Sequence, residues 1–373
     1  MRRFPQELVD LVIDVVGATA DNTDIGTCGL ICRQWLPRTR RHLFSGIDLS
    51  NADPASIQEF LDLVDASCTP ILPLVKSLNM CLVNGPFTEA HMARLNDCHA
   101  VSELHIDSPP HISGECTTPV EDLPFQCWLQ THIPQFGAAC LSLARFELVL
   151  GSDMPLRILV DVISSLPSLT HLRICGEEGY GLLASDAVPA TDTLPPNLHT
   201  LDMSLRRGTN LFFEWLLSCD KTLVFTSLTL GGRANGAPIW PIEAYLKRVG
   251  TEIEALTISY WADGLKATYA FEDHVLTFTN KLVHLSLARQ YPHFLGTRLA
   301  HPASSHLARI SIEVRPVPDH ILAELSSLDT ILGTSQYRAL RHISFTDEVS
   351  KEPFNIAQLR AVMPQANQRG ILN

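Results

Sequence analysis

A pattern of seven residues recurs ten times along this chain and constrains its fold more than any other feature. Each copy is apolar at positions one, four and six, and no copy is apolar at position five. The copies begin at Val75, Val101, Leu143, Leu169, Leu198, Phe225, Ile253, Leu282, Leu307 and Leu340. Successive starts lie about 29 residues apart on average. Recurrence at such a period predicts a repeat architecture, which grows by stacking similar units rather than by enlarging one core.

The alternation inside each copy is typical of a β-strand with one buried and one wet face. A sheet covered by helices on both faces would instead have nearly continuous apolar strands. Apolar spacing between the copies predicts helices over residues 156–166, 212–217, 241–249 and 318–332, and a loop over residues 109–124. We therefore expect an α/β solenoid over residues 45–350, with a curved parallel sheet of about ten strands and helices on its convex side. Residues 351–373 are expected to form a C-terminal cap or tail.

Composition narrows the classes of function. The formal net charge of −12 argues against a nucleic-acid surface, which would be basic. No apolar run is long enough to span a membrane, and Glu7 and Asp10 follow Met1 too closely for a signal peptide. We expect a soluble protein of the cytoplasm or nucleus that binds neither nucleic acid nor membrane. The ten scattered cysteines are expected to be reduced thiols.

The copies resemble leucine-rich repeats, because each one reproduces the L-x-x-L-x-L core of that family. The resemblance covers about three quarters of the chain and implies a concave, helix-free sheet face that binds other proteins. Neighbouring strands would set the polar positions in rows about 4.8 Å apart. The candidate partner-binding residues on this face are Glu103, His105, Asp107, Arg145, Glu147, His171, Arg173, Asp202, Thr229, Thr257, His284, Arg309 and His342. The alternative is a solvated face whose charges pair across strands, each pair contributing about 0–1 kcal/mol.

Residues 1–44 precede the repeats and form a separate helical segment. Apolar residues at positions 8, 9, 12, 13 and 16 predict an amphipathic helix over residues 4–16 that Pro5 opens. A polar break over residues 21–27 separates it from a second helical piece over residues 28–44. A segment this short buries little core of its own, so we expect it to dock on something.

This segment resembles an F-box in the order of its residues, which are Phe4, Pro5, Glu7, Val9, Val12, Ile13, Val16, Ile31, Cys32, Arg33 and Trp35. Phe4 stands where the family usually has leucine. Residues 359–364 and 369–372 are also similar to the ending of fungal F-box proteins. The resemblance implies that the segment binds a Skp-type adaptor, and through it a cullin, while the repeats recruit a protein substrate for a ubiquitin ligase. It implies adaptor contacts by Phe4, Pro5, Leu8, Val9, Val12, Ile13 and Trp35.

The sequence allows two other interpretations. The segment could be a helical cap on a leucine-rich-repeat scaffold with no connection to a ligase, because solenoids need covered ends. An enzyme is the poorer class, since no H-E-x-x-H, G-x-S-x-G or P-loop motif is present. Cys28 and Cys32 are the closest cysteine pair and lack a second pair at zinc-finger spacing. We therefore expect no catalytic residues, no metal site and no cofactor.

Overall fold

The computed structural model describes all residues except 1–4, 20–21, 51, 68–69, 82–86, 109–122, 177–179, 185–193, 206, 220–222, 234–239, 262–274, 291–294, 296–298, 300–303, 315–320, 348–349 and 373. The chain divides into two compact units. Unit 1 comprises Met1–Val149 and Ser165–Leu169, and unit 2 comprises Leu150–Ser164 and Thr170–Asn373. The division falls inside the repeat array.

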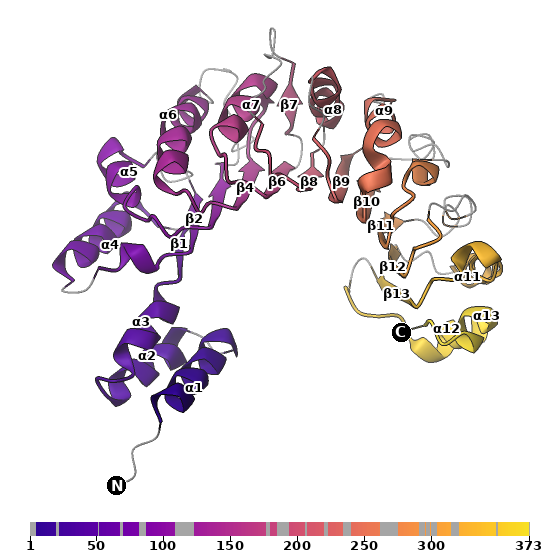
Figure 1. The fold of residues 1–373 in the computed structure, drawn as a ribbon, viewed down its shortest axis with the longest axis horizontal. Helices are drawn as coiled ribbons and strands as arrows, with labels where there is room; N and C mark the ends of the chain where they lie inside the picture. The colour runs from indigo at the N-terminus through magenta and orange to yellow at the C-terminus, as the bar shows by residue number, and fades with distance from the viewer. Residues whose placement is uncertain are drawn as a thin grey trace. The chain divides into compact units, whose positions relative to one another are not determined.

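Unit 1 begins with three short helices that pack on one another, α1 (Gln6–Thr19), α2 (Asn22–Ile31) and α3 (Leu36–Leu43). Four parallel strands follow in the order β1 (Gly46–Leu49), β2 (Ser77–Cys81), β3 (Glu103–Asp107) and β4 (Arg145–Leu150). The connections carry α4 (Pro54–Ala66), the 3-10 turn η1 (Leu72–Leu74), α5 (Glu89–Leu95) and α6 (Leu123–Ala139). Figure 1 shows these helices on one side of the strands, as a one-sided solenoid requires.

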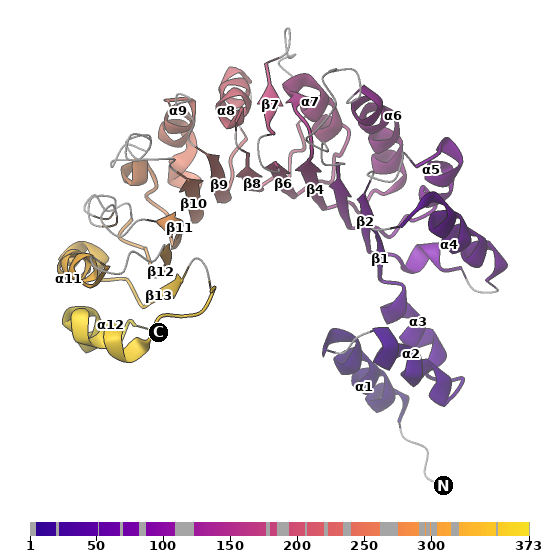
Figure 2. The same ribbon diagram turned by 180° about the vertical axis from the view of Figure 1, so that it is seen from behind.

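Unit 2 continues the same alternation. Its strands are β6 (His171–Gly176), β8 (Thr200–Ser204), β9 (Ser227–Arg233), β10 (Ala255–Trp261), β11 (His284–Gln290), β12 (Arg309–Val314) and β13 (His342–Asp347). The helices are α7 (Leu156–Ser164), α8 (Thr209–Ser218), α9 (Trp240–Val249), α11 (Ile321–Leu332), α12 (Ile356–Val362) and α13 (Pro364–Gln368). Short 3-10 turns are η2 (Gly250–Glu252), η4 (Val275–Phe278) and η5 (Ser335–Tyr337), and β5 (Met154–Pro155) pairs with β7 (Leu182–Leu183). Both views place α8, α9 and α11 on one side of the strands (Figures 1 and 2).

All ten predicted strands form, and each begins at position three of its seven-residue copy. In β8, Leu201 and Met203 are fully buried at positions four and six, while Asp202 between them faces the other way. The parallel register keeps equivalent positions opposite each other, as Leu201 opposite Leu228 shows. The expectation of an α/β solenoid with helices on one side, similar to leucine-rich repeats, is confirmed.

Strand β1 is an eleventh copy that the prediction missed. Phe44, Ile47 and Leu49 occupy positions one, four and six, with Asp48 at position five. The register confirms the match, because Ile47 lies opposite Leu78 in β2. Phe44 therefore ends the helical segment and also begins the first copy of the repeat.

The predicted helices over residues 156–166, 212–217 and 241–249 are confirmed by α7, α8 and α9, and α11 confirms the described part of residues 318–332. The prediction of a polar break over residues 21–27 is wrong for residues 22–27, which lie in α2. Packing overrides their weak helix propensity, since Ile25 is buried and a Cβ on Gly29 would lie 3.2 Å from Thr39. Of the predicted loop, residues 109–122 lie outside the described residues, and Leu123 begins α6.

The C-terminal residues pack against α11 and β13. Asp329 of α11, with 2% of its surface exposed, accepts hydrogen bonds from the backbone N–H groups of Gln365 (2.9 Å) and Ala366 (2.8 Å). The N–H of Ile343 in β13 donates to the carbonyl of Ile371 at 2.7 Å. These bonds satisfy backbone groups at both the start of α13 and the edge of β13.

Candidate binding surfaces

Helix α1 has two apolar faces. Ile13, which is 1% exposed, lies in the core of the three helices, and Val9 and Val16 are partly buried on the same side. The second face consists of Leu8, Leu11, Val12 and Val15, which we call the α1 stripe. Their spacing of three, four and seven residues puts them on one side of a helix.

The α1 stripe is solvent-exposed. Leu8, Leu11, Val12 and Val15 are 48%, 58%, 51% and 56% exposed, respectively. At the end of α2, Leu30 and Ile31 are 87% and 59% exposed. Scattered apolar side chains are ordinary on protein surfaces, but a contiguous stripe of them marks an interaction site.

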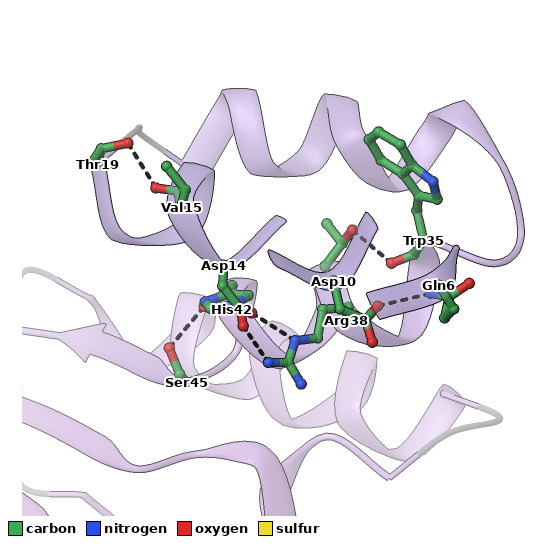
Figure 3. A network of polar contacts seen from close by, with 10 residues as sticks. Gln6, Asp10, Asp14, Val15, Thr19, Trp35, Arg38, His42 and Ser45 are labelled. Carbon is green, nitrogen blue, oxygen red and sulfur yellow. Dashed lines mark hydrogen bonds and ion pairs between the residues drawn. The ribbon is translucent and has the colours of Figure 1, made fainter. Parts of the chain in front are cut away.

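A polar network joins α1 to α3 (Figure 3). Arg38 donates from Nε to Oδ1 of Asp14 at 2.7 Å and from Nη2 to Oδ2 of the same carboxylate. Nε2 of His42 lies 2.8 Å from Oδ1 of Asp14. The hydrogen bonds from Arg38, and secondly from His42, hold the pKa of Asp14 well below its usual value. A two-nitrogen contact of this kind fixes orientation as well as distance, so it orients α1.

Two further contacts shape the same helices. A Cβ added to Gly17 would lie 2.6 Å from Cγ of His42, so only glycine allows α3 this close to α1. The carbonyl oxygen of Trp35 accepts hydrogen bonds from the N–H of Thr39 at 3.0 Å and from its hydroxyl at 2.8 Å. Thr39 is fully buried, and Trp35, partly exposed, precedes the first residue of α3.

The predicted adaptor contacts differ in their exposure. Phe4 lies outside the described residues; Pro5, Leu8 and Val12 are exposed, and Val9 and Trp35 are partly buried. Ile13 holds the three helices together, and its burial removes it from the candidate contacts. The predicted adaptor contacts do not include Leu11, Val15 or Leu30, and Ile31 was named only in the F-box-like order. Leu11 and Val15 could have been predicted from the sequence, because they complete the helical spacing that Leu8 and Val12 begin.

In unit 1, the helix-free face brings five predicted residues into neighbouring positions. Nε2 of His105 lies 2.7 Å from Oδ1 of Asp107, and Nδ1 lies 3.3 Å from Oε2 of Glu147. Arg145 lies 3.5 Å from Glu103 on the adjacent strand. The predicted rows are confirmed here, and charges of opposite sign pair across them.

In unit 2, the helix-free face changes from charged to hydroxyl-bearing along position five. Arg173 pairs with Asp202 at 3.3 Å, and His171 precedes Arg173 by two residues in β6. The next members of the row, in register from strand to strand, are Thr229, Thr257, Ser286, Ser311 and Ser344. Within unit 2, position five is therefore charged on β6 and β8 and carries hydroxyl groups on the five strands that follow.

Position three forms a second row on the last three strands. His284 lies opposite Arg309, and Arg309 lies opposite His342. Burial, then Arg309 and then His342 lower the pKa of His284. The row thus gathers three side chains that can carry positive charge, with serines at position five beside them.

Among the described residues, no cluster of three or more His, Cys, Asp or Glu side chains could hold a metal ion. Cys28 and Cys32 are free thiols. In the same part of the chain, no helix is both long enough and apolar enough to cross a bilayer.

No protein-family model matches this chain, and no curated protein sequence does. Among solved structures, the leucine-rich repeat-containing protein LegL7 from Legionella pneumophila is similar, with 13% identity and a TM-score of 0.48 over 87% of this chain and 97% of that one. A Bacteroides fragilis protein shows 12% identity and a TM-score of 0.32 over 78% of this chain and 70% of its own. Both TM-scores are below 0.5, so neither likeness bears on function.

Proposed function

We propose that this protein is the substrate-recognition subunit of a cullin-RING ubiquitin ligase. The N-terminal helices dock on a Skp-type adaptor through the α1 stripe, with Leu30, Ile31 and the exposed Pro5 as further contacts. The helix-free face of the repeats binds the protein substrate. The exposure of the α1 stripe carries this proposal, and the F-box-like order of Pro5, Glu7, Cys32, Arg33 and Trp35 gives the partner its class.

Burial favours docking over the cap interpretation. A cap would turn its apolar face toward the first repeat, yet Leu11 and Val15 are more than half exposed. The first repeat has cover of its own, because Ile57 and Leu61 of α4 are buried, as is Leu49 of β1. Covering a leucine or valine side chain contributes about 1.5–3 kcal/mol, so four such residues leave a substantial driving force for association.

Co-purification with a Skp-type adaptor tests the proposal. The intact chain is expected to form a stable complex, and Leu11→Asp combined with Val15→Asp is expected to abolish it. Both side chains already face solvent, so the double variant should fold. Leu63→Asp on α4 is the matched control, because Leu63 is 55% exposed compared with 58% for Leu11. No complex with the intact chain, or equal binding by both variants, would refute adaptor docking.

Deletion separates this proposal from the capped scaffold. Removing residues 1–43 should leave soluble repeats if those residues are a docking module. Aggregation of the truncated chain, with the intact chain failing to bind adaptor, would instead support a cap on a leucine-rich-repeat scaffold with no ligase connection.

A further inference from the structure

The helix-free face over β11, β12 and β13 combines cationic and hydroxyl side chains. His284, Arg309 and His342 form one row, and Ser286, Ser311 and Ser344 form the next. We call these six residues the β11–β13 patch. Neighbouring strands lie about 4.8 Å apart, so the two histidines are within about 10 Å of each other with Arg309 between them.

Arg309 differs from the other arginines of the helix-free faces. Arg145 has Glu103 as its partner and Arg173 has Asp202. Arg309 is exposed, and among the described residues no carboxylate pairs with it. Glu313 on the same strand is already occupied by an ion pair with Lys351. The guanidinium therefore keeps its donors for a ligand.

The rows also favour an anion electrostatically. After burial, Arg309 is the next cause of the lowered pKa of His284, so the positive charge of Arg309 acts on the neighbouring strand, where a bound anion would offset it. Ser344 donates to the hydroxyl oxygen of Ser311 at 3.4 Å, and the proton of Ser311 remains available as a donor. A planar guanidinium beside hydroxyl donors suits the oxygens of a carboxylate or phosphate.

We propose that the β11–β13 patch binds an acidic segment of the partner protein, with Arg309 and the serine hydroxyls donating to a carboxylate or phosphate group. Charge complementarity selects this occupant, since Arg309 is a permanent cation with no carboxylate partner among the described residues, in a chain whose net charge is −12. The inference rests on the proposed use of the helix-free face for substrate and is independent of adaptor docking.

Three fluorescein-labelled peptides of equal length test the patch by fluorescence anisotropy with the full chain at low ionic strength. One is rich in aspartate, one carries phosphoserines, and one has asparagine at every acidic position. At least one anionic peptide should bind and the neutral one should not. Arg309→Gln should weaken binding at least about tenfold, whereas Arg309→Lys should retain part of it and added salt should weaken it. Arg157→Gln on α7 is the control, because it removes the same charge from the helix-bearing side.

Each outcome of the peptide experiment either supports the proposal or overturns it. Binding of both anionic peptides supports recognition of the shared negative charge, and binding of one identifies the source as carboxylate or phosphate. The proposal is overturned if neither anionic peptide binds more tightly than the neutral one, or if Arg309→Gln and Arg157→Gln reduce binding equally. Adaptor binding by Arg309→Gln, measured in parallel, separates the two proposals, since it should equal that of the unchanged chain.

Discussion

Arg38 on α3 holds Asp14 on α1 through two nitrogens, Nε at 2.7 Å from Oδ1 and Nη2 on Oδ2. The pair lies on a different side of α1 from the α1 stripe, because Asp14 is two residues from Val12 and one from Val15 on a helix of 3.6 residues per turn. Arg38 therefore orients α1 without covering the residues proposed to dock.

Gly17 and Gly26 make a matched pair. Alanine is the better helix former by about 0.5–1 kcal/mol, so Gly26→Ala, with nothing within 4 Å of its Cβ, should stabilise α2 by about that amount. Gly17→Ala should destabilise instead, because its Cβ would displace His42 from Asp14. Hydrogen–deuterium exchange over residues 6–19 should become faster in Gly17→Ala and should not in Gly26→Ala. Equal exchange in the two variants would contradict the close approach of His42.

The contact between Asp14 and Arg38 predicts a pH dependence. The pKa of Asp14 is lowered in the folded chain, so its contribution to stability is complete above the ordinary carboxyl pKa of about 4 and is lost as pH falls toward the folded-state pKa. Hydrogen–deuterium exchange over residues 6–19, corrected for the intrinsic pH dependence of amide exchange, should therefore become faster below about pH 4. In Asp14→Asn, amide exchange over the same residues should be faster at neutral pH and should lose much of its dependence on pH. An unchanged pH profile in the variant would show that other carboxyl groups cause it.

Asp329 predicts how strongly the C-terminal residues are held. Its carboxylate accepts two backbone N–H groups at the start of α13 while almost fully buried, so Asp329→Ala should cost about 2 kcal/mol. Chemical denaturation and limited proteolysis after residue 350 would measure the loss. Asp53 provides the comparison, because it caps α4 through the N–H of Ser56 at an exposed site. Asp53→Ala should cost less, and the reverse order would contradict the buried role of Asp329.

Within strand β8, substitution of a core residue should cost far more stability than substitution of its neighbour on the helix-free face. Leu201 is fully buried at position four of its copy, so Leu201→Ala should lower the free energy of unfolding by about 2–5 kcal/mol. Asp202 faces the helix-free side and pairs with half-exposed Arg173, so Asp202→Ala should cost about 0–1 kcal/mol. Urea denaturation of the two variants compares them directly. Similar losses would mean that the two faces of β8 are equally buried.

The strands could be predicted from the sequence because a half-buried strand leaves its period in every copy. In β8, for example, the buried residues Leu201 and Met203 flank the partly exposed Asp202. The same pattern at Phe44, Ile47 and Leu49 is harder to recognise, because Phe44 is also the last residue of the F-box-like segment. Helix α2 could not be predicted in this way, since Gly26 and Gly29 weaken its propensity and packing against Thr39 holds it.

The candidate surfaces were only partly predictable. Residue spacing predicts that Leu8 and Ile13 lie on one helix, α1. Which of the two is buried depends on how α2 and α3 pack against α1, and in the structure it is Ile13. The rows on the sheet followed from the repeat, because equivalent positions lie opposite each other. Pairing of charges across strands was one of the two interpretations of this face, but the sequence did not show which arginine would have a carboxylate partner; Arg173 has Asp202, and Arg309 has none among the described residues.

Isothermal titration calorimetry of the full chain against a purified Skp-type adaptor tests the central claim most directly. Docking through the α1 stripe predicts a one-to-one complex with a negative heat-capacity change, the sign of apolar burial. It also predicts that Leu11→Asp with Val15→Asp weakens binding at least about a hundredfold, while Leu63→Asp leaves the affinity unchanged. No measurable heat with the intact chain, or an undiminished affinity in the double variant, would contradict the account.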